Sequence, residues 1–442
     1  MKFVVLILFM ALSAGTTIAA DNWKAKTENP SYIHRAIKQV TDVMIYDIYS
    51  PPVCSRTYAY ISIAGYEAAV GGYPQFQSLC TQLNGLKKLP VPGPGKEYSH
   101  TIAAVQAILS VAKTMVISEE RIDVFYKNIM AELRESGIPL DVYDNSIAFG
   151  QSIAKHILEW AANDNYKETR ALSRYAITSE ESTWKPTPPA YMKAVEPHWS
   201  KIRTFLIDSA QQFKPLPPTA FSPAKESKFY QEALAVREIG LQLTTEQKEI
   251  ASFWDCNPFK MNVNGHVMYA SKKISPGGHW MNIAALACKK TAADVMRSLE
   301  VYACLAITIA DAFASCWDEK YRSLVIRPET YINRYIDGAW QPFLQTPPFP
   351  EYTSGHSVIS TASAVMLEKI FGADFAFSDS TELEFGIPVR NFTSFAQAAE
   401  EAAISRFYGG IHYMPAIRNG CDEGRLIGNF ITSNLRTTTE NK

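Results

Sequence analysis

Apolar residues recur mainly at helical spacing along this chain, and the strict alternation typical of strands is scarce. Spacing near 3.6 residues predicts helices, because side chains three and four positions apart share one helix face. In the first part of the chain the pattern predicts helices at residues 31–72, 99–117, 118–136 and 141–163. We therefore expect an all-α fold, built from two helical bundles packed as one body.

A proline-rich stretch separates the two helical parts. Residues 184–223 contain eight prolines, together with Trp184 and Trp199. Prolines exclude long helices, whereas the aromatic residues argue against a disordered linker. We expect an ordered, irregular connection, which divides the chain into an N-terminal helical region at 21–183 and a C-terminal helical domain at 224–435.

Helical spacing returns after this connection. Helices are predicted at 225–240, at 246–254 and, as the longest, at 291–326. The last contains a segment that is apolar on all sides, so it should be buried. If this helix runs through both Lys320 and Arg327, the two cations lie on one face two turns apart, and Pro328 ends the helix. Buried cations need anions, which are either acidic side chains or a ligand.

One carboxylate, Asp255, lies in the apolar stretch F-W-D-C-N-P-F. Two roles stay open for it: it neutralises a buried arginine, or it caps a turn. The stretch is followed by a loop rich in glycine and asparagine, after which His279 is placed to begin the next helix.

Composition and the N-terminus limit the partners and the compartment. The net charge is −1, with no basic field that would point to nucleic acid. Residues 1–20 have the basic start, apolar core and small residues of a secretory signal peptide, and no later segment has 18 uninterrupted apolar residues. We expect a secreted or periplasmic protein, outside the membrane, as a monomer or small homo-oligomer. Of seven cysteines, Cys54 and Cys80 are candidates for a disulfide.

Two polar clusters follow the long helix. The first is F-P-E-Y-T-S-G-H-S at 349–357, directly before an apolar helix that ends at Gly372. Ser354, Gly355 and His356 are thus placed at a helix N-terminus, where free N–H groups and the helix dipole favour an anion. The second cluster closes an alanine-rich helix, with Arg406 in its last turn.

The candidate residues match the needs of a tetrahedral oxyanion. Guanidinium groups, an ammonium and backbone N–H groups bind its oxygens, and a histidine can bind its central atom or carry a proton. The residues that supply these groups are Lys320, Arg327, Ser354, Gly355, His356, Arg406 and His412.

Three motifs in this order resemble the signatures shared by type 2 phosphatidic acid phosphatases and vanadium-dependent haloperoxidases. Lys320, Arg327 and Pro328 match K-x6-R-P, Pro350 to His356 match P-x-Y-x-S-G-H, and Ser405 to His412 match S-R-x5-H. Trp317 and Phe349 resemble aromatic positions of the haloperoxidase branch. The spacing is similar to that of bacterial iodoperoxidases.

The resemblance implies the site and its chemistry. The cofactor would be vanadate, bound to His412 and held by Lys320, Arg327, Ser354, Gly355 and Arg406. His356 would help to deprotonate hydrogen peroxide, Lys320 would polarise the peroxide, and the halide would leave as hypohalous acid. Trp317 and Phe349 would shape the halide approach, although both are equally explained as core aromatics. Asp255 would orient Arg406. Iodide is the expected halide, since it is the easiest to oxidise.

Two other functions stay open. The first is an exported acid phosphatase in which His412 is phosphorylated and His356 protonates the leaving group. Phosphatases of the wider family usually carry an aspartate four residues after this histidine, where this chain has Ala416, so the position weakens that hypothesis unless Asp422 or Glu423 substitutes. The second is a non-catalytic oxyanion-binding or structural helical protein, for which so many buried cations would be a costly core.

Overall fold

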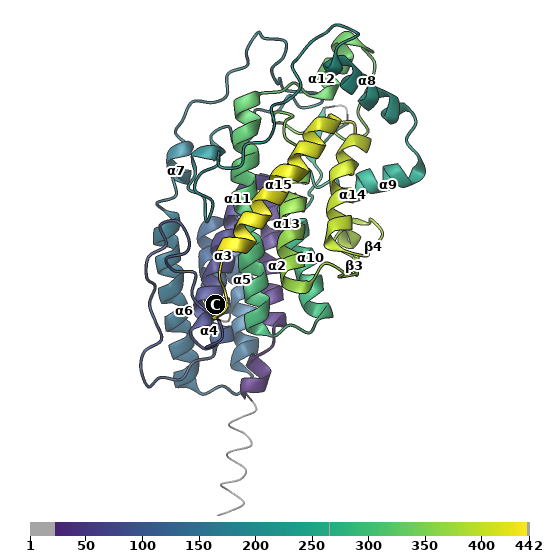
Figure 1. The fold of residues 1–442 in the computed structure, drawn as a ribbon. Coiled ribbons are helices and arrows are strands. Elements are labelled where there is room, and N and C mark those ends of the chain that lie inside the picture. Colours follow the sequence, from purple (N-terminus) through teal and green to yellow (C-terminus); the bar gives the residue numbers. More distant parts are fainter. Residues whose placement is uncertain (1–22, 265, 440–442) are drawn as a thin grey trace, which may run out of the picture.

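The computed structural model describes residues 23–439 except residue 265, so the signal peptide expected at 1–20 lies outside the described residues. The predicted all-α architecture is confirmed (Figure 1). The helices are α2 (Ser31–Tyr46), α3 (Pro51–Val70), α4 (His100–Met115), α5 (Glu119–Arg134), α6 (Leu140–Ala161), α7 (Tyr166–Thr169), α8 (Lys228–Leu241), α9 (Thr245–Phe253), α10 (Pro276–Lys290), α11 (Val295–Ser323), α12 (Pro328–Tyr335), α13 (Gly355–Phe371), α14 (Phe395–Tyr408) and α15 (Met414–Asn434), with the short 3-10 helices η1 (Trp199–Lys201) and η2 (Leu383–Phe385).

Two short antiparallel hairpins complete the described structure. One pairs β1 (Met261–Asn264) with β2 (Val267–Ala270), and the other pairs β3 (Phe377–Asp379) with β4 (Arg390–Phe392). The first occupies the segment expected to be a plain loop. Its strands are four residues long, which is too short for a clear alternation in the sequence.

Polar side chains begin many of the helices. Ser50, Ser99, Asp294 and Ser354 each accept a hydrogen bond from the backbone N–H three residues further on. These bonds satisfy donors that have no partner inside the helix, and each typically stabilises a helix by about 1 kcal/mol. Most helix starts therefore follow from local sequence.

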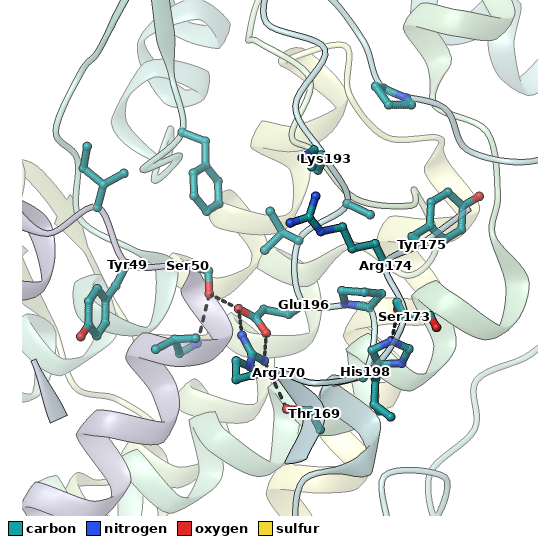
Figure 2. Close-up of a pocket in the computed structure, with 18 of the residues that line it drawn as sticks. Tyr49, Ser50, Thr169, Arg170, Ser173, Arg174, Tyr175, Lys193, Glu196 and His198 are labelled. Carbon is teal, nitrogen blue, oxygen red and sulfur yellow. Dashed lines mark hydrogen bonds and ion pairs between the residues drawn. The ribbon is translucent and has the colours of Figure 1, made fainter. Parts of the chain in front are cut away.

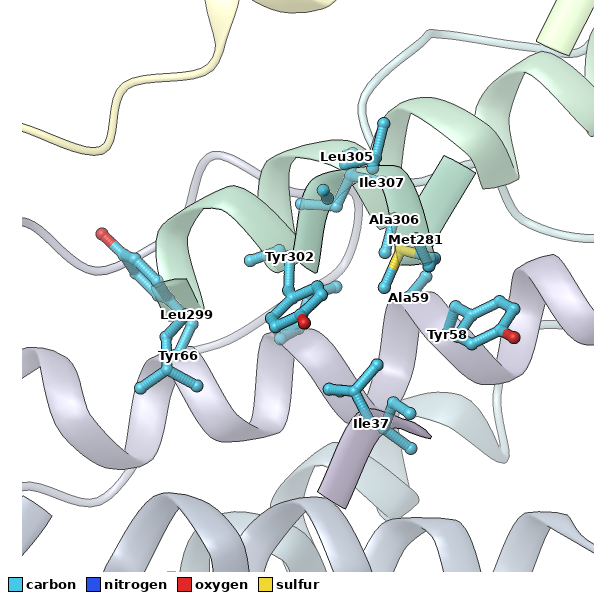
Figure 3. Close-up of a cluster of buried hydrophobic side chains, with 14 of the residues drawn as sticks. Ile37, Tyr58, Ala59, Tyr66, Met281, Leu299, Tyr302, Leu305, Ala306 and Ile307 are labelled. Carbon is cyan, nitrogen blue, oxygen red and sulfur yellow. The ribbon is translucent and has the colours of Figure 1, made fainter. Parts of the chain in front are cut away.

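Helix α11 is the centre of the molecule, between α3 on one side and α13 on the other. One continuous apolar core joins α2–α6 with α10, α11 and α13–α15, and Figure 3 shows its part around Ile37, Tyr66 and Tyr302. Among the described helices, α11 has the length and apolar character of a membrane span, but its apolar window is wholly buried inside the protein. It is thus explained as a core helix.

The helix predicted at 31–72 is two helices, and this prediction was wrong. The chain turns between Asp47 and Ser50, with Ile48 at a left-handed φ of 55°. Ser50 caps α3, and Pro51 takes the first helical position, where its missing N–H costs nothing. A proline pair inside one long helix would have removed two backbone hydrogen bonds.

The helix predicted to run through Arg327 ends earlier. Leu324 adopts a left-handed conformation, with φ of 52°, directly after α11. Arg327 is the N-cap of the next helix, and Pro328 begins that helix instead of ending the previous one. Lys320 and Arg327 therefore reach the same region from two helices.

The connection at 184–223 is irregular, as expected, with η1 as its one regular element among the described residues. Trp184 and Trp199 are buried, which anchors the segment on the helices. All seven cysteines lie within the described residues and are free thiols, so Cys54 and Cys80 do not pair. The domain boundaries drawn from the sequence stay a prediction.

Helices α13 and α15 pack at very close range through glycines of α15. A Cβ atom added at Gly424 would lie 2.3 Å from the carbonyl oxygen of Val358, which belongs to the backbone of α13. Because α13 carries Ser354, Gly355 and His356 at its start, this contact also positions the candidate site.

We expect Gly424→Ala to lower the free energy of unfolding by about 1–3 kcal/mol, the usual cost of overpacking. Thermal unfolding followed by circular dichroism measures this as a lower Tm. Gly338→Ala is the matched control, because an added Cβ there would lie 3.5 Å from the nearest atom, an ordinary contact. Equal Tm values for the two variants would contradict the proposed close packing.

Candidate active site

The residues of the three motifs converge where the end of α11 meets the starts of α12 and α13 and the end of α14. The loop at 347–354 runs between them and passes beside the turn that follows α14. Ser354 caps α13 by accepting from Ser357 N–H, at 3.4 Å, which leaves its own proton free to donate. Gly355 and His356 form the first turn, where N–H groups lack partners inside the helix. The structure thus places the predicted residues at a helix N-terminus.

Lys320 lies fully buried near the end of α11, beneath this loop. Its ammonium donates to the carbonyl oxygens of Pro350 and Glu351, both at 3.1 Å, and to that of Thr353. Burial, to which the charge of Arg327 adds, lowers the pKa of Lys320 to about 8. The lysine therefore holds the loop in place and adds positive charge under it.

Arg327 reaches the loop from the start of α12. Its Nε donates to Phe349 O at 3.0 Å, and its Nη1 donates to Ile411 O at 2.8 Å and lies 3.1 Å from His412 Nε2. The remaining nitrogen, Nη2, is buried and has no hydrogen-bond partner. Burial lowers the pKa of Arg327 to about 10. An unpaired guanidinium N–H in the interior carries a desolvation cost, which a bound acceptor would offset.

His412 has a carboxylate partner that the sequence did not reveal. Its Nδ1 lies 2.8 Å from Glu351 Oε1, which also accepts from Tyr413 N–H at 3.0 Å. Burial, followed by the charge of Arg327, lowers the pKa of His412 well below its ordinary value. A neutral His412 that donates from Nδ1 presents a lone pair at Nε2, the nitrogen that faces Arg327.

Glu351 thus supplies the carboxylate missing at Ala416. Neither substitute considered from the sequence does so: Glu423 accepts instead from Thr353 Oγ1 and Ser315 Oγ, and Asp422 accepts from Arg425. Burial raises the pKa of Glu351 to about 7, although Arg327 and Lys320 oppose the shift. The sequence did contain a sign of this role, because Glu351 is the acidic residue inside the second motif, between Pro350 and Tyr352.

Arg406 and His356 face the site from the opposite wall. Arg406 donates from Nε to Ser405 Oγ at 2.9 Å and from Nη2 to Trp254 O at 2.7 Å. His356 Nε2 is buried and unpaired. Burial, reinforced by the charge of Arg406, lowers the pKa of His356 well below its ordinary value. This imidazole is neutral, with a nitrogen free to exchange a proton.

Asp255 makes no ion pair with Arg406. Its carboxylate lies 2.8 Å from Lys273 Nζ and 3.6 Å from Lys260 Nζ. Its charge still acts on Arg406 through space, where it opposes the lowering of the arginine pKa by burial. Ser405 and the carbonyl oxygen of Trp254 orient Arg406 directly, because the end of α9 turns toward the end of α14.

His356, Arg406 and His412 line one cavity of about 30 Å³. Trp317 and Phe349, whose rings pack with centroids 5.0 Å apart, form its apolar wall. The Phe349 ring also lies 5.2 Å from Lys320 Nζ and 5.1 Å from Arg327 Cζ. The polar residues that line the cavity are Asp255, Cys256, Asn257, Gln345, His356, Arg406 and His412.

A larger cavity of about 800 Å³ adjoins the first, since Phe259 lines both. In Figure 2, Glu196 accepts hydrogen bonds from Arg170 and Ser50, whereas Arg174 and Lys193 extend along the same cavity. For neither Arg174 nor Lys193 does the described part of the chain supply an ion-pair partner. Their charge favours anions beside the shared wall.

The donor set fits a tetrahedral oxyanion such as vanadate. Three buried cations meet here, while Glu351 bonds to His412 and Asp255 pairs with two lysines, so neither carboxylate pairs directly with Arg327 or Arg406. Burying a single ion costs several kcal/mol, which only a partner of opposite charge offsets. The unpaired Arg327 Nη2 marks where an acceptor belongs, and the unpaired His356 Nε2 marks where a proton donor belongs.

Comparisons with known proteins show the family and the fold. The family model described as the VCPO second helical-bundle domain matches residues 300–441. The chain is similar to the structure described as the first bacterial vanadium-dependent iodoperoxidase, with 45% sequence identity, a TM-score of 0.89, and coverage of 94% of this chain and 99% of that chain.

Two more distant structures share the fold. The holo form of a bacterial vanadium-dependent chloroperoxidase aligns at 15% identity and a TM-score of 0.67, covering 88% of this chain and 93% of its own. The apo form of a bacterial vanadium-dependent chloroperoxidase aligns at 15% identity and a TM-score of 0.66, and the alignment covers 87% of this chain and 94% of that chain. A comparison with curated proteins finds no match.

Proposed function

Because this chain belongs to the vanadium-dependent haloperoxidases, we propose that it oxidises iodide with hydrogen peroxide to hypohalous acid. Its cofactor is vanadate. The observation that carries the proposal is the buried cluster of Lys320, Arg327 and Arg406 around two neutral histidines, in a chain 45% identical to an iodoperoxidase.

Vanadate, when bound, supplies a Lewis-acidic centre that activates hydrogen peroxide toward the halide. Arg327, through its unpaired Nη2, and Arg406 would hold its oxygens. The N–H of Gly355 and the hydroxyl of Ser354 would add neutral donors at the start of α13. Lys320 holds the loop at 347–354 through its carbonyl oxygens and would contribute its positive charge.

His412 would serve as the metal ligand through Nε2. Glu351 accepts a hydrogen bond from Nδ1–H, which fixes the tautomer and the orientation of the ring. Arg327 Nη1 lies 3.1 Å from Nε2 and would balance the charge of the anion.

His356 carries the proton. A neutral imidazole with an unpaired Nε2 accepts a proton from incoming hydrogen peroxide and returns it to the product. Nearby Arg406 disfavours a lasting imidazolium, so the proton is released again.

The halide reaches the site past Trp317 and Phe349. These rings give the cavity an apolar wall, which a large and weakly hydrated anion such as iodide tolerates better than chloride does. Iodide also needs the weakest oxidant of the halides. Arg174 and Lys193 line the larger cavity, and their positive charge concentrates anions there, beside the wall formed by Phe259.

A phosphatase activity of the vanadate-free protein is the second candidate. The Glu351–His412 pair orients the histidine as a carboxylate would in a phosphohistidine mechanism, so the absence of an acid at position 416 no longer counts against it. Phosphate and vanadate are both tetrahedral anions and would compete for the same donors.

The test uses mature protein reconstituted with orthovanadate and then dialysed. With hydrogen peroxide and iodide, we expect triiodide formation that requires vanadate and is suppressed by excess phosphate. Bromide, followed with a brominatable dye, should be turned over at least about tenfold more slowly, which corresponds to 1.4 kcal/mol in the barrier. Vanadate-independent phosphate ester hydrolysis without halide oxidation would contradict the proposal.

A further inference from the structure

A second polar cluster adjoins the vanadate pocket, whose lining includes the cysteine of the cluster, and it has no role in the proposed reaction. Cys256, His279 and Glu382 come from the segment after α9, the first turn of α10 and the turn after β3. All three residues are buried, His279 completely. One ligand atom from each lies within 4.8 Å of the others. Segments far apart in the sequence thus bring a thiol, an imidazole and a carboxylate together.

The hydrogen bonds in this cluster leave one group unsatisfied. Cys256 Sγ lies 3.5 Å and Glu382 Oε1 lies 3.2 Å from the same nitrogen, His279 Nδ1. One N–H serves one of them at a time, and Glu382 Oε1, on a side chain 2% exposed, accepts no hydrogen bond. A buried carboxylate oxygen without a donor is costly. A single cation among the three atoms would satisfy all of them.

The distances match a tetrahedral metal. Bonds of about 2.3 Å to sulfur and about 2.0 Å to nitrogen or oxygen separate neighbouring ligands by about 3.3–3.5 Å. The observed separations of 3.2 and 3.5 Å are close to these values. Thiolate, imidazole and carboxylate form a ligand set that favours zinc, because magnesium and calcium prefer sites built from oxygen ligands alone.

The other face of the imidazole is already supported. His279 Nε2 lies 2.8 Å from Asp379 Oδ2, and the second oxygen of Asp379 accepts from Thr381 N–H at 2.9 Å. A carboxylate that accepts from the distal N–H of a ligating histidine is the usual support of zinc sites, because it fixes the tautomer with the lone pair toward the metal.

We propose that Cys256, His279 Nδ1 and Glu382 bind a zinc ion, with a water molecule as fourth ligand. The site adjoins the vanadate pocket, which Cys256 also lines. Trp254 stacks on His279, with ring centroids 4.5 Å apart, and its carbonyl oxygen accepts from Arg406. Zinc at this position ties α9, α10 and the β3 turn together and thereby steadies the arginine that holds vanadate. The proposal is independent of the halide that the enzyme oxidises.

The test measures metal content in the absence of vanadate. Mature, untagged protein is equilibrated with zinc, passed over a desalting column, and analysed by inductively coupled plasma mass spectrometry. We expect one zinc per chain in the wild type and a loss of at least about tenfold in Cys256→Ser. Cys288→Ser is the matched control, since Cys288 is a buried thiol of α10 outside the cluster and should leave the zinc content unchanged.

A spectroscopic measurement on unaltered protein guards against misfolded variants. Chelator-treated wild type titrated with cobalt(II) should develop a thiolate-to-cobalt charge-transfer band, which Cys288→Ser retains and Cys256→Ser lacks. Absence of this band from the wild type, or a wild type that retains no zinc, would overturn the proposal and leave His279 as an imidazolium between Asp379 and Glu382. Halide oxidation by the same sample reports separately on the haloperoxidase function.

Discussion

His412→Ala is expected to lose vanadate affinity by more than about 100-fold and, with it, halide oxidation. Loss of a supporting group around a metal ligand alone costs 10–100-fold, and this substitution removes the ligand itself. It also leaves Glu351 without the Nδ1 proton that it accepts now. Vanadate binding is measured by isothermal titration calorimetry, and turnover by triiodide formation.

His156→Ala serves as the control, because among residues 23–439 without 265 the hydrogen-bond partner of His156 is the carbonyl oxygen of Ser152 in its own helix, and His156 does not line the cavity. It should retain wild-type affinity and rate. If His412→Ala bound vanadate within tenfold of the wild type, the assignment of His412 as the metal ligand would be wrong.

Glu351→Ala is expected to weaken vanadate binding by about 10–100-fold, the usual effect of removing the group that orients a metal-bound histidine. Without the carboxylate, the Nδ1 proton and the ring orientation of His412 are no longer fixed. Glu351→Gln should retain more affinity, since its amide oxygen still accepts from Nδ1. The measurement is again the dissociation constant for vanadate, together with the pH profile of turnover.

Glu423→Gln separates this positioning role from support of the loop. Glu423 is a buried carboxylate that accepts from Thr353 in the same loop, and burial raises its pKa to about 7, as for Glu351. It does not contact His412, so the variant should keep its vanadate affinity. Equal losses in Glu351→Ala and Glu423→Gln would mean that both residues only hold the loop.

The local sequence determined the helices and the donor set. Helical spacing of apolar residues and N-caps such as Ser99 and Ser354 act within three or four positions, so they are visible without a fold. The three motifs were visible for the same reason, because each keeps its spacing within one short segment. Residues of the second and third motifs line one cavity, and Arg327 of the first motif reaches His412 beside it. The roles drawn from the resemblance stay a prediction.

Backbone turns were less visible. The left-handed residues Ile48 and Leu324 carry no glycine or asparagine signal, and the helices predicted through them were too long. A proline after such a turn begins a helix as readily as it ends one, and Pro328 was interpreted in the wrong sense.

Tertiary structure alone decided how the charged groups pair. Glu351 and His412 are 61 positions apart. Cys256 and Glu382 come from separate segments, and both side chains approach His279 Nδ1. Asp255 turned to Lys273 and not to Arg406. Such pairs depend on which helix ends lie together in the folded core. The low dielectric there strengthens each pair and makes an unpaired charge costly. The periodicity of apolar residues along the chain does not indicate which helix ends become neighbours.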